Sequence, residues 1–260
     1  MNRLRSSDFQ ADNAKELTAQ VQYRDGKNDA EETAVICEHI LDVIINGRHI
    51  YRIICTGSDL KELVTGRLVT DGLIKKTDDI RDLFFCKSGN EARVFLDPDM
   101  TWKDTVFNVS TCCAGNRTFL CSNGTDRLRK LPACEWKPEW VFALADEFGR
   151  GSKIHDMTGG SHVSILAREG KTLCVCEDIG RHNAVDKAVG YALLNGIPLS
   201  ECMIFTSGRV PVDMVEKVIS AGIPVLVSKS SPTEQSVKLA KEYGLNLICR
   251  AWPDRYACFS

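Results

Sequence analysis

Several features that define common protein classes are missing from this 260-residue sequence. No apolar run approaches the roughly 18 residues needed to span a bilayer, and the N-terminus lacks the apolar core and small-residue cleavage site of a secretory signal. The patterns G-x-x-x-x-G-K-[ST] and G-x-G-x-x-G do not occur, so ATPase and dinucleotide-binding functions lack their motifs. We therefore expect a cytoplasmic protein that does not associate with membranes.

The chain also has little net charge. It carries 33 Lys and Arg against 35 Asp and Glu, which gives a formal net charge of −2. A nearly neutral chain has no general attraction for nucleic acid or anionic lipid, so we expect no nucleic-acid partner. The hydrophobic fraction of 43% and charged fraction of 26% are typical of a soluble globular protein.

Cysteine, in contrast, is abundant, with 12 residues, but no two are spaced as C-x-x-C. The usual zinc and thioredoxin-type motifs are therefore absent, and we expect no bound metal. Most of the thiols are expected to be reduced and buried as small apolar side chains. Five of them lie in apolar, strand-like runs: Cys37, Cys55, Cys174, Cys202 and Cys249.

The first half of the chain predicts a small α+β domain. Residues 1–28 are polar and irregular, which indicates a flexible arm. Residues 29–115 combine short strand-like runs with a helical pattern that starts near Ser58, and this domain ends in a cysteine loop. Within it, Asn46-Gly47 between two apolar runs predicts a type I′ hairpin.

The second half predicts a larger α/β domain over residues 137–260, after a linking loop at residues 116–136. Helices near residues 138–148, 211–221 and 232–243 follow or alternate with apolar strand-like runs. This alternation predicts right-handed crossovers and a largely parallel sheet covered by helices. The fold class is therefore α/β, with a smaller N-terminal α+β domain.

Polar residues follow the predicted strands where ligands usually bind in an open α/β sheet. Ser207, Gly208 and Arg209 lie between a strand and a helix, and Arg181 and His182 begin another helix. Free N–H groups at helix starts, hydroxyls and an arginine together favour an anion, most plausibly a phosphate.

Other residues at these junctions have simpler explanations. Ser231, with Glu234 three residues later, fits a capping box that only starts a helix. Asp178 can be a helix cap, or it and Glu177 can accept hydrogen bonds from a ligand. His162 follows two glycines, which favours close approach of a ligand, although a lone histidine can equally be a buried, hydrogen-bonded residue.

Cys112 and Cys113 stand side by side after a strand-like run and before a loop-like Ala-Gly-Asn. Neighbouring side chains of a strand point to opposite faces, so burying both would be difficult. A thiol on a loop near positive charge has a lowered pKa, and Arg117 is a local source of that charge. A nucleophilic or sulfur-carrying thiol is therefore favoured over a core residue.

Taken together, the motifs resemble those of the FdhD family of formate dehydrogenase accessory proteins, over roughly residues 30–260. The strings that carry the resemblance are GSDLKELVTGRLVTDGLI, TGGSH, EDIGRHNAVDKAVG, SGRVPVDMVEK with AGIPVLVSKSSPT, and YGLNLICRAWPDR, in this order along the chain.

The resemblance implies a sulfurtransferase. Members of this family accept sulfur from a cysteine desulfurase as a cysteine persulfide. They pass it to the molybdenum (or tungsten) bis-pyranopterin guanine dinucleotide cofactor, which is a bound substrate here, before it enters the catalytic subunit of formate dehydrogenase. It also implies a cytidine-deaminase-like fold for the C-terminal domain. We expect a homodimer, because α/β domains of this type often pair.

The resemblance also assigns roles to residues. Cys113 matches the persulfide cysteine and Cys112 is a possible assistant, whereas Asn116 stands where many members have a second cysteine. A two-thiol relay would therefore need Cys112 or Cys121 as a substitute. The other residues expected to bind the cofactor are His162, Arg181, His182, Ser207, Arg209, Thr233, Arg250, Ala251, Trp252, Pro253, Asp254 and Arg255; among them the arginines at 181, 209 and 255 are expected to contact phosphate, and the position of Asp254 is more usually glycine.

Two alternatives stay open. A zinc-dependent, deaminase-like hydrolase would need H-x-E and P-C-x-x-C patterns, but His162 is followed by Val163-Ser164 and no C-x-x-C exists. A non-catalytic chaperone would bind the cofactor and hand it over without moving sulfur. Only a requirement for Cys113 separates this chaperone from a sulfurtransferase.

Overall fold

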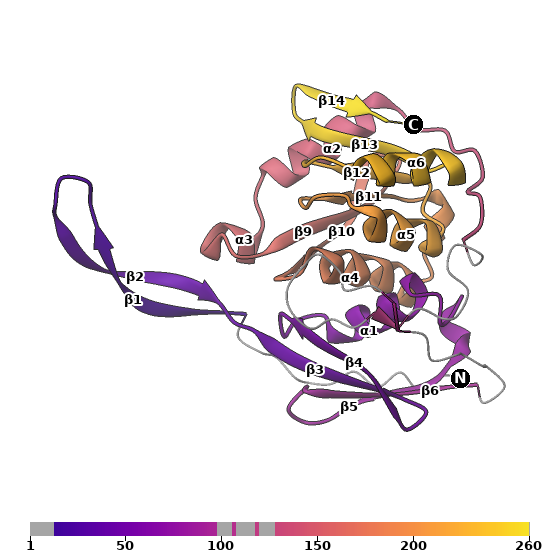
Figure 1. Ribbon diagram of the computed structural model, residues 1–260, viewed down its shortest axis with the longest axis horizontal. Helices are drawn as coiled ribbons and strands as arrows, with labels where there is room; N and C mark the ends of the chain where they lie inside the picture. Colours follow the sequence, from indigo (N-terminus) through magenta and orange to yellow (C-terminus); the bar gives the residue numbers. More distant parts are fainter. Residues whose placement is uncertain (1–12, 98–105, 108–117, 120–127, 260) are drawn as a thin grey trace.

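The structure is a computed structural model that describes residues 13–97, 106–107, 118–119 and 128–259. It comprises an arm, a four-stranded sheet and a six-stranded sheet (Figure 1). Cys112 and Cys113 lie outside the described residues, as do Asn116, Arg117 and Cys121.

The first two strands form an arm that leaves the body of the protein. Strands β1 (Ala14–Gln22) and β2 (Asn28–Ile36) pair antiparallel, and Figure 1 shows this ribbon projecting sideways. The prediction of an irregular segment over residues 1–28 was therefore wrong for residues 14–28. Both faces of the ribbon are largely open to solvent, so its sequence lacks the clear apolar–polar alternation by which a half-buried strand is recognised.

The N-terminal half of the body is a sheet with the strand order β4-β3-β6-β5. Its strands are β3 (His39–Ile45), β4 (Arg48–Cys55), β5 (Ile80–Phe85) and β6 (Glu91–Leu96). The predicted hairpin is confirmed: Asn46 and Gly47 join β3 to β4 with φ angles of 47° and 81°, as a type I′ turn requires.

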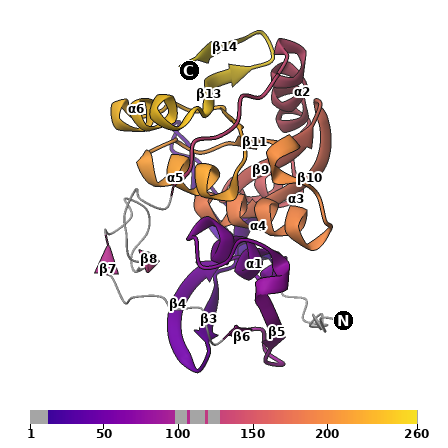
Figure 2. The same cartoon turned by 90° about the vertical axis from the view of Figure 1, so that its right-hand side faces the viewer.

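Helix α1 (Leu60–Thr70) lies between this sheet and the rest of the body (Figure 2). It begins after Asp59, one residue later than the predicted cap at Ser58. The remaining elements of this half are a 3₁₀ turn at Thr77–Asp79 and the short paired strands β7 (Val106–Phe107) and β8 (Thr118–Phe119).

The C-terminal half is built on a sheet with the strand order β10-β9-β11-β12-β13-β14. Its strands are β9 (His162–Arg168), β10 (Lys171–Asp178), β11 (Met203–Thr206), β12 (Val225–Ser228), β13 (Asn246–Trp252) and β14 (Arg255–Cys258). The prediction of a largely parallel sheet was wrong, because three of its five pairings are antiparallel. Helical connections lead from β10 to β11, from β11 to β12 and from β12 to β13, whereas β9 and β14 are joined by hairpins to β10 and β13 and run antiparallel to the other strands.

Helices cover both faces of this sheet (Figure 2). Helix α2 packs on one face; α4, α5 and α6 pack on the other. The helices are α2 (Pro138–Gly149), α3 (Lys153–Thr158), α4 (Arg181–Leu194), α5 (Val212–Ala221) and α6 (Glu234–Tyr243), with a 3₁₀ turn at Leu199–Glu201. The predicted helices near residues 138–148, 211–221 and 232–243 are confirmed.

The two halves share one hydrophobic core, and the contact between α1 and α4 joins them. Leu41 and Leu63 of the first half belong to the same cluster as Val185 and Leu247 of the second. The helices approach so closely that a Cβ on Gly66 would lie 1.8 Å from the carbonyl oxygen of Asp186, and one on Gly190 would lie 1.9 Å from that of Glu62. Only glycine fits at either position.

Six buried charged side chains surround this helix contact: Arg67, Asp71, Asp178, Asp186, Lys187 and Lys217. Lys217 Nζ lies 2.9 Å from Asp186 Oδ1, and Lys187 Nζ lies 2.7 Å from Asp178 Oδ2. Arg67 Nε lies 2.7 Å from an oxygen of Asp71. Three cations therefore balance three anions, which is the condition under which buried charges are tolerated.

The pKa of Asp71 reflects this balance. Burial alone would raise it, but Arg67 and Lys217 outweigh burial and hold the pKa at about 2. Thr70 completes the link between the halves, because its Oγ1 donates to Asp186 Oδ1 at 2.6 Å and accepts from Lys217 Nζ at 2.8 Å.

We predict that Gly190→Ala destabilises the protein by about 3 kcal/mol, because the new methyl group would force α1 and α4 apart. Gly149→Ala is the matched control: Gly149 ends a helix, and no atom lies within 4 Å of the position its Cβ would take. Urea unfolding of both variants measures the difference. Equal free energies of unfolding would contradict the importance assigned to this contact.

Candidate functional site

The loops that follow β10, β11 and β12 lie together at the carboxyl ends of these strands. The start of β9 lies at the same edge of the six-stranded sheet. Strand β9 runs antiparallel to β11, so its first residues lie beside the end of β11. There, the Ser207 N–H donates to the Val163 carbonyl at 2.9 Å. The loops after β11 and β12 remain joined beyond their strands, since the Val210 N–H donates to the Ser231 carbonyl at 3.1 Å.

Arg181, the first residue of α4, is buried beneath the loop that follows β11. The residue is 8% exposed, and its side chain runs across Gly208 so closely that a Cβ there would lie 2.8 Å from Arg181 Cδ. Among the described residues, no group accepts a hydrogen bond from its buried Nε. A buried guanidinium nitrogen without an acceptor is costly, so this position suits an anionic ligand.

Hydrogen bonds to the carboxylate of Asp178 hold the N-terminus of α4 in place. The helix starts after Gly180, whose N–H donates to Asp178 Oδ1 at 2.9 Å. Asn183 Nδ2 donates to the same oxygen at 2.9 Å and to the Ile54 carbonyl at 2.9 Å. The buried carboxylate of Asp178 therefore fixes the helix start that carries Arg181.

His162 and Ser207 form a polar pair next to this arginine. His162 Nδ1 lies 3.3 Å from Ser207 Oγ. Because that oxygen already accepts from the Val163 N–H at 3.0 Å, its proton is free to be donated to the imidazole. Burial, the charge of Arg181 and His155 lower the pKa of His162 below its ordinary value. The imidazole is therefore neutral near pH 7.

His182 is the next residue of α4 and faces α5. Its Nε2 lies 3.6 Å from Asp213 Oδ2, which is too long for a hydrogen bond. Burial together with the charges of Lys217 and Arg181 lowers the pKa of His182 well below its ordinary value. This side chain is therefore a neutral imidazole beside the buried cations.

A second group of basic and aromatic residues lies at the ends of β12 and β13. Lys229 Nζ lies 5.0 Å from the ring centre of Trp252 and 4.8 Å from that of Phe148. Trp252 is 41% exposed. Arg250 Nε donates to Ser231 Oγ at 3.3 Å, and its backbone adopts a left-handed φ of 53°. A positively charged, partly open aromatic surface results.

The other residues of the predicted C-terminal binding stretch differ in their exposure to solvent. Ala251 is buried in the core, whereas Pro253, Asp254 and Arg255 are exposed where β13 turns into β14. Arg209 is exposed in the loop after β11. The sequence did not predict strand β14, and it did not single out Lys229, although a basic residue directly after a strand was the available signal.

Several predicted junction residues have structural roles. Thr233, not Ser231, caps α6, and its partner in the capping box is Ser236. Glu177 accepts from the His155 N–H at 2.7 Å and from Ser152 Oγ at 2.8 Å, so it holds the start of α3.

Within residues 13–97, 106–107, 118–119 and 128–259, no three His, Cys, Asp or Glu side chains lie together in a way that could hold a metal ion. In the same residues, none of the helices is both long and apolar enough to cross a membrane.

Comparison with known proteins identifies the family. The sequence profile of the FdhD/NarQ family matches residues 36–260. The chain belongs to this family. The resemblance to FdhD proteins that the sequence motifs indicated is thereby confirmed.

Two relatives illustrate the similarity. The chain is 31% identical over 246 residues to the sulfur carrier protein FdhD of Streptomyces avermitilis, which covers 88% of this chain and 87% of that protein. It is 30% identical over 234 residues to the sulfur carrier protein FdhD of Bacillus subtilis, which covers 87% and 88%.

One solved structure supports the same fold. The crystal structure of a proposed formate dehydrogenase accessory protein from Desulfotalea psychrophila has a TM-score of 0.76 and 26% identity, and it covers 95% of this chain and 96% of that one. A guanine deaminase from Nitrosomonas europaea has a TM-score of only 0.36 over 47% of this chain. The cytidine-deaminase-like fold therefore stays a prediction.

The FdhD string EDIGRHNAVDK can now be divided by task. Glu177 holds α3, and Asp178, Asn183 and Lys187 fix α4 to the first half of the body. Arg181 differs from these residues, because its buried Nε has no acceptor in the described part of the chain. His182 Nε2 is also buried without a partner in these residues, but Arg181 alone carries a permanent charge, so it is the residue of this string best suited to bind an anion.

We predict that Arg181→Gln raises the pKa of His162, because a nearby positive charge disfavours the imidazolium. Burial remains, so the pKa should stay below the ordinary value. Arg209→Gln is the matched control, since Arg209 lies in the same loop region but is exposed and does not contribute to the shift. NMR titration of the His162 ring protons measures both. An unchanged pKa in Arg181→Gln would contradict the placement of its charge.

Proposed function

We propose that this FdhD protein is a sulfur carrier that supports formate dehydrogenase. In this proposal it accepts persulfide sulfur from a cysteine desulfurase in the cytoplasm. It then transfers the sulfur to the molybdenum bis-pyranopterin guanine dinucleotide cofactor before the cofactor enters the catalytic subunit. Membership of the FdhD/NarQ family and the names of the curated relatives support the role in sulfur transfer.

The observation that carries the cofactor-binding part is the buried Nε of Arg181, which has no acceptor among the described residues. The cofactor brings diphosphate groups, and a guanidinium is the side chain that best matches phosphate oxygens. Gly208 leaves the space above Arg181 free of a side chain. Ser207 offers a hydroxyl and Arg209 an exposed positive charge beside it. These residues fit the anionic part of the cofactor.

The guanine part would bind to the second group of residues. Trp252 presents an exposed indole, and a flat aromatic ring stacks well on a base. Lys229 lies over this indole, so the base would displace the lysine side chain or stack on the other face. Arg250 and Arg255 supply further positive charge at this edge.

The sulfur chemistry is assigned to Cys113, which lies outside the described residues. Its thiolate attacks the outer sulfur of the desulfurase persulfide, the S–S bond of the donor breaks, and the donor cysteine leaves as a thiolate. In the second step the cofactor would supply the electron pair that bonds to the outer sulfur, the S–S bond to Cys113 would break, and Cys113 would leave as a thiolate. Cys112 is proposed only as an assistant to this exchange.

The cofactor-binding part of the proposal leads to a prediction about affinity for guanosine diphosphate. Arg181→Gln should weaken binding about 10- to 100-fold, because a charge-assisted hydrogen bond to phosphate contributes roughly 1.5–3 kcal/mol. Arg168→Gln is the control, since Arg168 is exposed at the opposite end of β9, where it pairs with Glu201. Isothermal titration calorimetry measures both affinities. Equal affinities for the two variants would remove Arg181 from the binding site.

The sulfur-transfer part leads to a prediction about mass. After incubation with a cysteine desulfurase and cysteine, the peptide with Cys112 and Cys113 should gain about 32 Da, the mass of one sulfur atom. The gain should persist in Cys112→Ala and vanish in Cys113→Ala, which should also fail to support formate dehydrogenase activity in cells. Full activity with Cys113→Ala would instead favour a cofactor-binding chaperone that moves no sulfur. Stoichiometric zinc in the purified protein would favour the deaminase-like alternative.

A further inference from the structure

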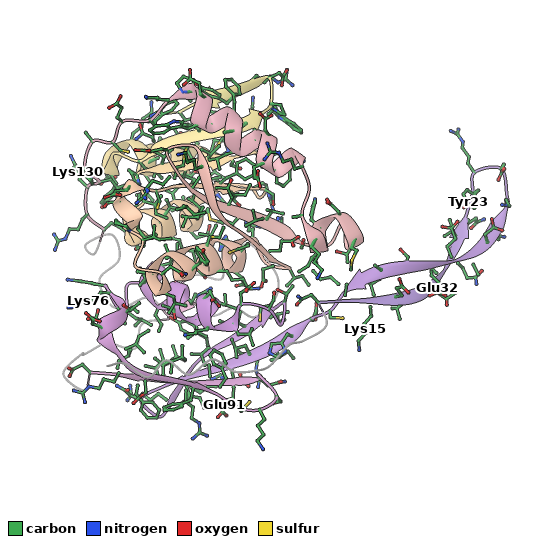
Figure 3. All side chains as sticks on the ribbon, turned by 180° about the vertical axis from the view of Figure 1, so that it is seen from behind. Lys15, Tyr23, Glu32, Lys76, Glu91 and Lys130 are labelled. Carbon is green, nitrogen blue, oxygen red and sulfur yellow. The ribbon has the colours of Figure 1, made fainter. Side chains whose placement is uncertain are left out.

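Strand β10 carries two cysteines on one of its faces. Cys174 and Cys176 are two positions apart, so their side chains point to the same side of the strand. The Cys176 thiol donates to Cys174 Sγ, and the two sulfur atoms lie 3.9 Å apart. Both side chains pack in the core that the two halves of the body share, which Figure 3 shows from behind. Neither thiol takes part in the proposed sulfur transfer.

The two thiols differ in their access to solvent. Cys174 is half-buried, whereas Cys176 is only 6% exposed. The hydrogen bond to Cys174 and burial both raise the pKa of the Cys176 thiol above its ordinary value. Because the thiolate is the attacking species, Cys174 is the thiol that reacts first with a reagent from solution. Cys176 then lies beside it, on the buried side.

A disulfide between these residues requires only a small change in the strand. Bridged cysteines usually have Cα atoms roughly 4.4–6.8 Å apart, and two residues of an extended strand span about 6.6 Å. Within the described residues, β10 lies at the end of the sheet and pairs with β9 alone. Its pairing is irregular between Thr172 and Cys174. An edge strand with such an irregularity can bend at this point without disturbing a second neighbour.

We propose that Cys174 and Cys176 are a redox site that closes to a reversible disulfide, with a small disulfide as the oxidant. The Cys174 thiolate attacks one sulfur of the small disulfide, whose S–S bond breaks, and one thiol leaves. The Cys176 thiolate then attacks Cys174 Sγ, and the second thiol leaves. The two cysteines lose two electrons, the small disulfide gains them, and the two cysteine protons end on the released thiols.

The disulfide would act on the start of α4. Cys176 stands two residues before Asp178, whose Oδ1 accepts from the Gly180 N–H at 2.9 Å. Between them, the Glu177 carbonyl accepts from Lys187 Nζ at 3.1 Å. Drawing the two sulfur atoms together shortens β10 directly before this segment, and the shift weakens both contacts. Oxidation therefore loosens the start of α4, whether or not this helix binds a cofactor.

Trypsin isolates the pair for a mass measurement. Cleavage after Lys171 and Arg181 gives a peptide, residues 172–181, in which Cys174 and Cys176 are the only cysteines. The full-length protein is treated with cystamine, a small disulfide, and its remaining thiols are alkylated. This peptide should then carry no alkyl group and be about 2 Da lighter than the reduced peptide, for the loss of two hydrogen atoms. Dithiothreitol should restore both thiols. Two free thiols, or a cystamine adduct on Cys174 without ring closure, would overturn the proposal.

Single variants test the order of attack. In Cys176→Ala the mixed disulfide should accumulate on Cys174, whereas in Cys174→Ala the buried Cys176 should stay unmodified. Cys202→Ala is the matched control, because Cys202 is another buried thiol of the same core, and here the disulfide should still form. Equal modification of the two thiols, or loss of the disulfide in Cys202→Ala, would contradict the assigned roles.

Amide hydrogen exchange, followed by NMR, measures the effect on α4. The Gly180 N–H should exchange about 10-fold faster in the oxidised wild-type protein than in the reduced one, because its hydrogen bond to Asp178 is weakened. Cystamine-treated Cys174→Ala should exchange at the reduced rate. Equal rates in oxidised and reduced wild-type protein would overturn the coupling to α4. This result would not bear on phosphate binding by Arg181, which guanosine diphosphate affinity tests separately.

Discussion

The contact between α1 and α4 is the constraint on which the rest of the structure depends. Gly66 and Gly190 allow each helix to rest on a backbone carbonyl of the other, and this closeness makes the two halves of the chain one body. It also brings Thr70 of α1 to Asp186 of α4 at 2.6 Å. A wider separation would break this buried hydrogen bond, which is costly in a medium without water.

The same contact determines where α4 begins. Lys187 binds Asp178 from within the helix, and Thr56 of the first half donates to the same carboxylate through its N–H at 3.1 Å. With three buried cations set against three buried anions, the interior charges cancel. Arg181 is an additional buried cation beside this balanced set. Its burial is unfavourable without an anion, and a bound phosphate would remove that cost, so the packing that stabilises the fold also prepares the site.

Local sequence signals predicted local structure well. The Asn46-Gly47 hairpin and the helices after residues 137, 211 and 232 follow from turn chemistry and apolar spacing, which depend on neighbouring residues. An arm was predicted, but its two strands were not, because they bury little on either face. The prediction of a largely parallel sheet was also wrong, because β9 and β14, which are supplied by hairpins, run antiparallel to β11, β12 and β13.

For the candidate site, we expected ligand-binding residues where strands end, and this correctly placed His162, Arg181 and Ser207 at one edge of the sheet. The sequence could not separate ligand-binding residues from structural ones, because the residues to which the structural ones bind are distant in sequence. Asp178 and Lys187 are anchored by Thr56, more than a hundred residues earlier. The cap of α6 is a smaller case. Ser231 was predicted as the cap but Thr233 is the cap, because both hydroxyl residues fit similar local rules.

Departures from ordinary structural rules concentrate at the proposed cofactor-binding edge. Among the described residues, four non-glycine residues have a positive φ: Asn46 and Glu169 form hairpin turns and Asp59 precedes a helix, whereas Arg250 lies inside a strand. Close to it are an exposed Trp252 and, across the joined loops, the buried Nε of Arg181. Strained backbone and unpaired buried groups persist only when the surrounding structure enforces them. They are typical of functional sites. The shared core and the fixed start of α4 supply that enforcement, so the edge can keep its binding groups in place before a ligand arrives.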